Sequence, residues 1–129
     1  MIKEVYHVAI TRFSIRMHSN EGFRGRSKEW LFNEVRLSQK LVLFEHVAFS
    51  SIAKGSKQPD LFLVLIDKEL PETIRQQLEN IIEPYHWAQT FEVEPGALAN
   101  MRDIGSLLGG FAIDSKYILT TNLDDDDAI

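Results

Sequence analysis

The chain of 129 residues has the length of one domain, and its 44% apolar and 26% charged residues are typical of a globular core rather than of a disordered chain. It contains no cysteine, which excludes disulfides and cysteine-based zinc sites. Residues 1–58 carry ten Lys or Arg and five Asp or Glu, whereas residues 59–129 carry four Lys or Arg and fourteen Asp or Glu. The resulting net charge of −5 argues against general nucleic-acid binding, which needs a concentrated positive surface.

The first half of the chain predicts a strand, a loop and a long helix. Residues 4–15 are rich in β-branched and aromatic residues and predict a buried strand. Residues 17–30 contain glycines and charges and predict a loop. Residues 33–53 predict a helix, because apolar side chains recur at spacings of three and four along one face. These side chains are Leu37, Leu41, Phe44, Val47, Ala48 and Ile52.

The second half of the chain predicts three more strands with helices between them. Residues 61–67 (LFLVLID) form a continuous apolar run and predict a strand that is buried on both faces. Residues 71–82 predict a helix with proline at its first position and acidic residues in its first turn. Residues 86–94 predict a third strand, and residues 98–113 predict one helix or two short ones. Residues 116–123 predict a fourth strand, which we expect to be buried.

The alternation of strands and helices predicts an α/β fold, with a mostly parallel sheet and flanking helices, in one domain over residues 1–129. In such sheets, ligands bind beyond the carboxyl ends of the strands, at the point where the strand order reverses. Polar residues stand at three of the predicted strand ends: Thr11 and Arg12 at the first, Asp67 at the second, and four aspartates, residues 124–127, at the fourth. These residues are therefore candidates for a binding site.

The four consecutive aspartates have two interpretations, a solvated acidic tail and a metal-binding corner. Two unit charges ~4 Å apart interact by roughly 4 kcal/mol at an effective dielectric constant of about 20. Four carboxylates in an ordered loop therefore need a compensating cation, whereas a frayed end needs none. Carboxylate oxygens suit Mg²⁺ or Mn²⁺, which bind through one or two carboxylates together with ligand phosphates. The charge pattern leaves both interpretations open, and the position directly after a strand expected to be buried favours the metal site.

Three stretches of the chain carry a resemblance to a known family. They are HVAITRFSIR at residues 7–16, LFEHVAFSSIAKGSKQPDLFLVLID at residues 43–67, and YILTTNLDDDDAI at residues 117–129. The last of them resembles the Leu-Asp-X-Asp-Asp corner of nucleotide-sugar glycosyltransferases with the GT-A fold. The chain as a whole resembles the bacterial family described as putative rhamnosyl transferases, and the three stretches cover most of it in the expected order.

The resemblance implies the N-terminal half of a GT-A, Rossmann-like domain that binds a nucleoside-diphosphate sugar. The implied donor-binding residues are Thr11, Arg12, Phe13, Asp67 and Asp124. The first three would hold the nucleoside, and Asp67 would face its base or ribose. Asp124 would face the ribose or the metal, and Asp126 would bind the Mg²⁺ or Mn²⁺ ion that bridges the diphosphate. No catalytic residue is identified, and the one candidate is Asp127, which would lie behind the metal ligands or on the acceptor side.

The resemblance further implies metal-dependent glycosyl transfer from this donor to a glycan or other acceptor. GT-A enzymes continue beyond the aspartate corner, so we expect these 129 residues to be the donor-binding part of a longer enzyme and to be inactive alone. An incomplete sheet would expose an edge strand and allow self-association. The sequence shows neither a signal peptide nor a membrane span, so we expect a cytoplasmic location, either free or peripheral at the inner membrane face.

Two other classes of protein fit parts of the pattern. A non-catalytic α/β module could use the acidic C-terminal segment to bind Ca²⁺ or a basic partner. A receiver or haloacid-dehalogenase-like domain places its key aspartate just after the first strand, where this chain reads ITRFS at residues 10–14, and this argues against that class. Arg24, Arg26 and Lys28 in the predicted loop could reach a diphosphate or could be solvated.

Overall fold

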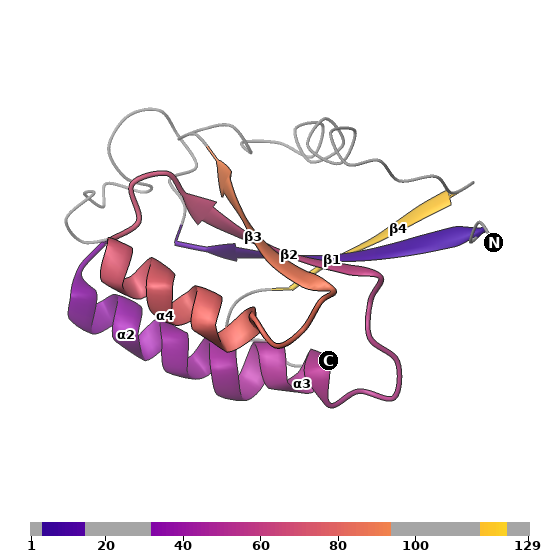
Figure 1. Ribbon diagram of the computed structural model, residues 1–129, viewed down its shortest axis with the longest axis horizontal. Helices are drawn as coiled ribbons and strands as arrows, with labels where there is room; N and C mark the ends of the chain where they lie inside the picture. The colour runs from indigo at the N-terminus through magenta and orange to yellow at the C-terminus, as the bar shows by residue number, and fades with distance from the viewer. Residues whose placement is uncertain (1–3, 15–31, 94–116, 124–129) are drawn as a thin grey trace.

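The computed structural model describes residues 4–14, 32–93 and 117–123, which form one parallel sheet and its helices (Figure 1). In chain order the elements are β1 (Val5–Phe13), α2 (Glu34–Leu43), the π-helical segment η1 (Phe44–Phe49), α3 (Ser50–Ala53), β2 (Leu61–Asp67), α4 (Glu72–Ile82), β3 (Ala88–Val93) and β4 (Tyr117–Asn122). The strand order is β3-β2-β1-β4, and every neighbouring pair is parallel. The predicted Rossmann-like α/β fold, with its parallel sheet and flanking helices, is confirmed.

The elements found in the structure begin and end close to the predicted positions. The first and second predicted strands correspond to β1 and β2, and β3 is two residues shorter at its start and one at its end than the predicted 86–94. The loop predicted at 17–30, the helix predicted at 98–113 and the aspartates at 124–127 lie outside the described residues. No helix in the described part of the chain has the length and hydropathy that crossing a membrane requires.

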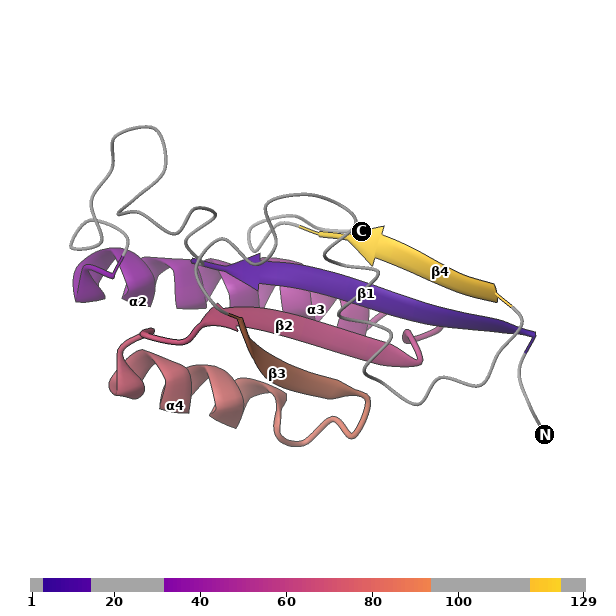
Figure 2. The ribbon, with the colours of Figure 1, turned by 90° about the horizontal axis from the view of Figure 1, so that it is seen from above.

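The helices in the described part of the chain lie on one face of the sheet. Figure 1 shows α2, α3 and α4 on the same side of the strands, and Figure 2, seen from above, shows β1 and β2 between the two edge strands. Alternate residues of β1 and β2 face the helices and belong to the main core: Ala9, Phe13, Phe62, Val64 and Ile66. The intervening residues form a second buried cluster on the opposite face: Val8, Ile10, Leu61, Leu63 and Leu65. As predicted, β2 is buried along its whole length.

The long helix predicted at residues 33–53 is present, and it contains a π-helical turn. Asn33 caps its N-terminus, because its side-chain oxygen accepts a hydrogen bond from the backbone N–H of Arg36 at 3.1 Å. In η1 the hydrogen bonds span five residues instead of four, which changes the phase of the side chains that follow. The predicted stripe is therefore wrong at two positions: Val47 is only partly buried, and Phe49, which was left out of it, belongs to the core.

Aromatic rings fill the space between the helices and the sheet. Phe44, the first residue of η1, is fully buried and lies edge-to-face with Phe13 at 6.1 Å between ring centroids. It stacks on Phe49 at 5.6 Å and meets Phe62 of β2 at 6.4 Å. Phe49 in turn stacks on Trp87 at 5.8 Å, just before β3. These ring contacts connect η1 to β1, to β2 and to the segment just before β3.

The second crossover helix, α4, buries Ile74, Leu78 and Ile82 in the main core and is tied to β3 by a charged side chain. Its helical turns begin at Glu72, so proline occupies the cap position rather than the first helical position predicted for it. Arg75 pairs with Glu92 of β3 through Nη1, and its Nε lies 3.3 Å from Glu79 Oε1. The hydrogen bond to Glu92, followed by that to Glu79, raises the pKa of the Arg75 guanidinium.

The fourth strand differs from its prediction in one respect, because most of β4 is exposed rather than buried. Tyr117, Ile118 and Leu119 are 55%, 44% and 55% exposed. β4 lies at the edge of the sheet and has β1 as its only strand neighbour within the described residues. Burial begins only after its end, at Leu123, which is 7% exposed and belongs to the main core. The apolar composition of residues 116–123 therefore predicted the β-strand correctly but did not predict that its side chains are exposed.

Candidate functional site

The strand order reverses between β1 and β4. The chain moves from β1 outward to β2 and β3, and then returns to place β4 on the other side of β1. In parallel α/β sheets this reversal opens a crevice beyond the carboxyl ends of the two strands. We call the rim formed by residues 11–14, 67–69 and 122–123 the carboxyl edge. The three predicted groups of site residues, at the ends of β1, β2 and β4, belong to this rim or follow it directly in the sequence.

The register shows where β4 delivers the chain. Asn122 is the partner of Ile10, and the backbone N–H of Leu123 donates to the carbonyl of Ile10 at 2.9 Å. Leu123 is therefore level with Thr11, close to the end of β1, and Asp124 is the next residue in the sequence. Asp124, Asp126 and Asp127 themselves lie outside the described residues, so their predicted roles stay predictions.

The three residues predicted to hold the nucleoside do not share a face of the sheet. Side chains alternate along β1, so Thr11 and Phe13 face the helices, where both are fully buried. Arg12 faces the opposite side of the sheet and is exposed. The ring of Phe13 packs against Phe44, and the ammonium of Lys40 lies 5.6 Å from its centroid. In this arrangement a ligand reaches Phe13 through its backbone and Arg12 through its side chain.

Thr11 carries an orphaned polar atom. Its Oγ1 is buried and has no hydrogen-bond partner within the described structure. Buried hydroxyls are normally satisfied, and an exception of this kind often marks a place where a ligand or water completes the bonding. Among the predicted site residues that the structure describes, Thr11 is the one with a buried side-chain oxygen that forms no hydrogen bond.

We expect the substitution Thr11→Val to raise the free energy of unfolding by about 1 kcal/mol, because a methyl group would replace a buried hydroxyl that forms no bond. Urea unfolding followed by circular dichroism measures the change. The matched control is Thr121→Val, which removes a hydroxyl that lies 2.8 Å from His7 Nε2 and should lower stability instead. A loss of 1 kcal/mol or more in Thr11→Val would show that this hydroxyl already has a partner.

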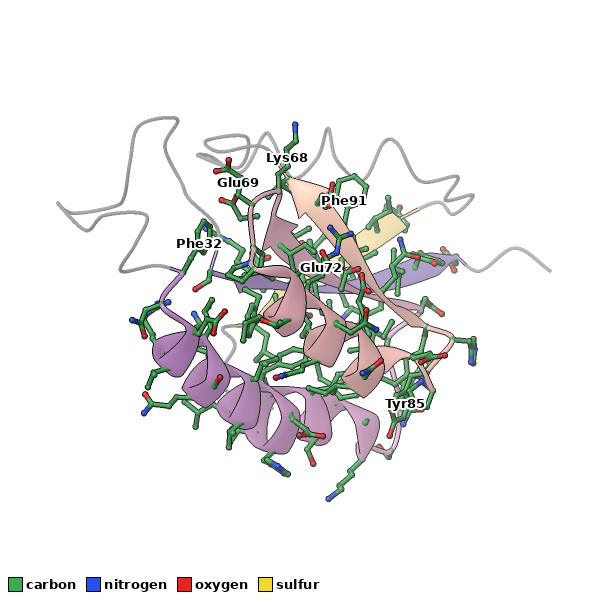
Figure 3. The ribbon with its side chains drawn as sticks, turned by 60° about the vertical axis from the view of Figure 1, so that its left-hand side comes forward. Phe32, Lys68, Glu69, Glu72, Tyr85 and Phe91 are labelled. Atoms are coloured by element: carbon green, nitrogen blue, oxygen red, sulfur yellow. The ribbon has the colours of Figure 1, made fainter. Side chains whose placement is uncertain are left out.

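Asp67 ends β2 and is almost completely buried, with 1% of its surface exposed. Its Oδ1 accepts a hydrogen bond from the backbone N–H of Glu69 at 3.0 Å, and its carbonyl accepts from the N–H of Leu70 at 3.0 Å. The carboxylate therefore shapes the turn that leaves the strand. Figure 3 shows Lys68 and Glu69 projecting from this turn, away from the helices. Asp67 is at the rim, as predicted, and part of its bonding capacity serves the turn.

Two residues that the sequence interpretation missed join the end of β1 to α2. Ser14 follows β1 directly and has a positive φ of 51°, which costs roughly 1 kcal/mol for a residue with a side chain. Its Oγ accepts a hydrogen bond from Nη1 of Arg36 at 2.8 Å. Ser14 is buried and Arg36 is half-buried. The residues are 22 positions apart, and neither periodicity nor motif spacing brings them together in the sequence.

The electrostatics of the carboxyl edge favour an anion with a counter-charge nearby. Both α2 and α4 begin at this side of the sheet, so the positive ends of their dipoles face it (Figure 1). The cations Arg12, Arg36 and Lys68 are on or beside the rim. Glu34 and Glu72 in the first helical turns reduce this positive potential. Within the described residues, no group of three or more ligating side chains could hold a metal ion.

One pocket in the described part of the chain lies away from the carboxyl edge. It has a volume of about 260 Å³ and is lined by residues from the middle of β1, the end of α3 and the segment that enters β2, among them His7, Ile52 and Lys57. The segment entering β2 stands at the opposite end of the sheet from the carboxyl edge. This pocket therefore does not coincide with the reversal of strand order.

The fold defines a class of protein first: a Rossmann-like α/β protein whose strand order reverses between β1 and β4. The model of the family described as "putative rhamnosyl transferase" matches residues 6–129, which is nearly the whole chain. The chain belongs to this family, as the resemblance indicated, and the description points to a transferase that takes a sugar from a donor to an acceptor. No curated protein and no solved structure matches the chain.

Proposed function

We propose that the chain is the donor-binding domain of a metal-dependent, GT-A-type glycosyltransferase that uses a nucleoside-diphosphate sugar, with rhamnosyl transfer as its reaction. The single observation that carries this proposal is the strand order. It puts the reversal between β1 and β4, and the aspartates at residues 124–127 follow β4 in the sequence at that point. The positive helix ends at the same side of the sheet support an anionic ligand.

The nucleoside would lie against the end of β1. Thr11 offers a buried hydroxyl without a partner, Phe13 offers its backbone, and Arg12 offers an exposed guanidinium on the other face. Asp67, at the end of β2, would accept a hydrogen bond from the base or the ribose. Each of these contacts would hold the donor in place, and such positioning lowers the entropic part of the barrier to sugar transfer.

The aspartates that follow β4 in the sequence would suit a hard divalent cation. Asp124 and Asp126 would hold Mg²⁺ or Mn²⁺, because carboxylate oxygens are the ligands that these ions prefer. When bound, the ion supplies charge neutralisation on the diphosphate leaving group. Asp124 would also reach the ribose, and Asp127 would stand toward the acceptor. The acceptor itself is a glycan or another hydroxyl compound.

Thermal unfolding tests the proposal. The chain is heated with Mn²⁺ alone, with UDP, GDP or dTDP alone, and with Mn²⁺ together with each nucleotide. We expect a stabilisation that needs both components, of about 2.7 kcal/mol when the nucleotide is at 100 times its Kd. A shift with Ca²⁺ alone that ignores nucleotide would contradict donor binding and would support a cation-binding module. The absence of any shift under all of these conditions would also contradict the proposal.

A further inference from the structure

Large apolar side chains are exposed along β4 and at the start of β1. They are Tyr117, Ile118, Leu119 and Val5. Figure 2 shows β4 at the edge of the sheet, beside β1. Val5 and Tyr117 are partners in the sheet, and side chains alternate along a strand, so both faces of this edge are apolar. Parallel sheets are normally covered on both faces, and an uncovered apolar surface of this kind is typical of an interface.

The backbone of β4 directs a row of hydrogen-bonding groups away from the sheet. The N–H of Tyr117 donates to Glu4 and that of Leu123 donates to Ile10, both at 2.9 Å, so the odd-numbered residues of β4 bond with β1. Backbone groups alternate in direction along a strand, and those of the even-numbered residues therefore point outward. The outward residues are Ile118, Thr120 and Asn122. In the described part of the chain no strand lies on this side of β4.

β4 lacks the features by which edge strands usually avoid pairing. Natural edge strands carry charged residues, proline or a bulge, each of which hinders the approach of another strand. The sequence of β4 is YILTTN, which contains neither a charged residue nor proline. Its register with β1 is continuous over all six residues, so no bulge interrupts it. A partner strand can therefore pair along the whole length of β4.

The outward residues are placed symmetrically about Thr120. A two-fold axis through Thr120 pairs this residue with its own copy, and it pairs Ile118 of each copy with Asn122 of the other. In an antiparallel ladder, residues that present their backbone groups to each other exchange both hydrogen bonds. All outward N–H and C=O groups of the two strands are then bonded. The edge of β4 is therefore complementary to itself.

The charges on either side of β4 favour the antiparallel direction. Lys116 precedes the strand in the sequence, and the aspartates at residues 124–127 follow it. An antiparallel copy brings the basic start of one strand to the acidic end of the other, which is the complementary arrangement. A parallel copy would instead bring the two acidic ends together, and like charges across a strand pair are destabilising.

We propose that β4 pairs with β4 of a second copy of this chain, antiparallel and centred on Thr120, in a symmetric dimer with one continuous sheet. Pairing of this kind derives its affinity from main-chain hydrogen bonds, with the exposed apolar side chains adding buried surface. The strand has only six residues, so the interface is small, and we expect a Kd on the order of 10 μM. The pairing requires neither metal nor nucleotide.

Sedimentation velocity over about a hundredfold range of chain concentration around this value tests the dimer. We expect the wild-type chain to change from monomer to dimer within the range. Thr120→Lys should raise the Kd about tenfold or more, because two like charges then stand directly opposite one another, and Thr120→Glu should do the same. An equimolar mixture of the two variants should dimerise at least as well as the wild type, because a lysine then faces a glutamate.

The matched control is Val42→Lys, which adds the same charge at an exposed apolar residue of α2 and should keep the wild-type Kd. Circular dichroism checks that each variant is folded, and we expect all of them to be, because the side chain of Thr120 is exposed as well. A wild-type chain that stays monomeric over the whole range would overturn the proposal. Thr120→Lys with the wild-type Kd, or a mixture that stays monomeric, would show that β4 is not paired about Thr120.

A disulfide tests the register directly, because the chain contains no cysteine of its own. The Cα atoms of a hydrogen-bonded antiparallel pair are about 5.5 Å apart, a separation that a disulfide can bridge. We therefore expect Thr120→Cys to form a covalent dimer on mild oxidation, seen on a non-reducing gel. Val42→Cys should stay largely monomeric under the same conditions. Equal linkage in the two variants would reflect chance collisions and would contradict the proposed register.

Discussion

Phe44→Ala is expected to lower the free energy of unfolding by about 3–5 kcal/mol, which is the cost of emptying a fully buried aromatic site. Phe44 has no exposed surface and contacts the rings of Phe13, Phe49 and Phe62. Its removal would therefore leave a cavity and also end three ring contacts. Because a domain of this size has a total stability of roughly 5–15 kcal/mol, the variant should be close to its unfolding midpoint at modest urea concentrations.

Two further variants keep this prediction measurable. Phe44→Leu fills much of the same volume, so the loss of packing should cost less than about 1.5 kcal/mol, to which the loss of the ring contacts is added. This variant should therefore fold even if the alanine variant does not. Val42→Ala is the control on the same helix, because Val42 is 57% exposed and should change stability by no more than about 0.5 kcal/mol. A cost for Phe44→Ala as small as that of Val42→Ala would mean that the ring cluster does not hold η1 to the sheet.

The position of Phe44 also shows what the sequence could and could not predict about the fold. Its burial follows from the apolar spacing of the helix, and the buried run of β2 follows from its composition alone. The inclusion of Phe49 depends on a π-helical turn, which arises from tertiary packing and leaves no mark in a period of 3.6 residues. The exposure of β4 depends on strand order, which no local pattern reports.

The candidate site was predictable to the extent that it consists of strand ends. Asp67 ends a recognisable apolar run, and a polar residue in that position in an α/β protein belongs to the rim by topology. The alternation along β1 was also readable, yet the resemblance grouped Thr11, Arg12 and Phe13 together although neighbours in a strand face opposite ways. The link between Ser14 and Arg36 could not be predicted, because it depends on how α2 lies across the sheet and on a backbone angle that serine rarely adopts.

Asp126→Asn is expected to abolish the stabilisation that Mn²⁺ and a nucleoside diphosphate produce together, which is the largest functional effect we predict. The substitution keeps the size of the side chain and removes the negative oxygen that a divalent cation prefers. Without the cation, the remaining aspartates would repel the negative diphosphate, so the affinity of the chain for the nucleotide should fall as well. Thermal unfolding in the presence of both components measures the loss, which amounts to the whole of the about 2.7 kcal/mol expected for the wild type at 100 times Kd.

The same variant has an opposite expected effect when no metal is present. Four neighbouring carboxylates repel one another, so removing one charge from an ordered corner should raise stability at low salt and do so less at high salt. Glu83→Gln is the charge-matched control for the response to Mn²⁺ and nucleotide, since Glu83 is an exposed carboxylate at the end of α4 and should leave this response unchanged. A solvated tail predicts no change in either direction. An Asp126→Asn variant that keeps the full response to Mn²⁺ and nucleotide would remove Asp126 from the metal site and leave Asp124 as the ligand to test.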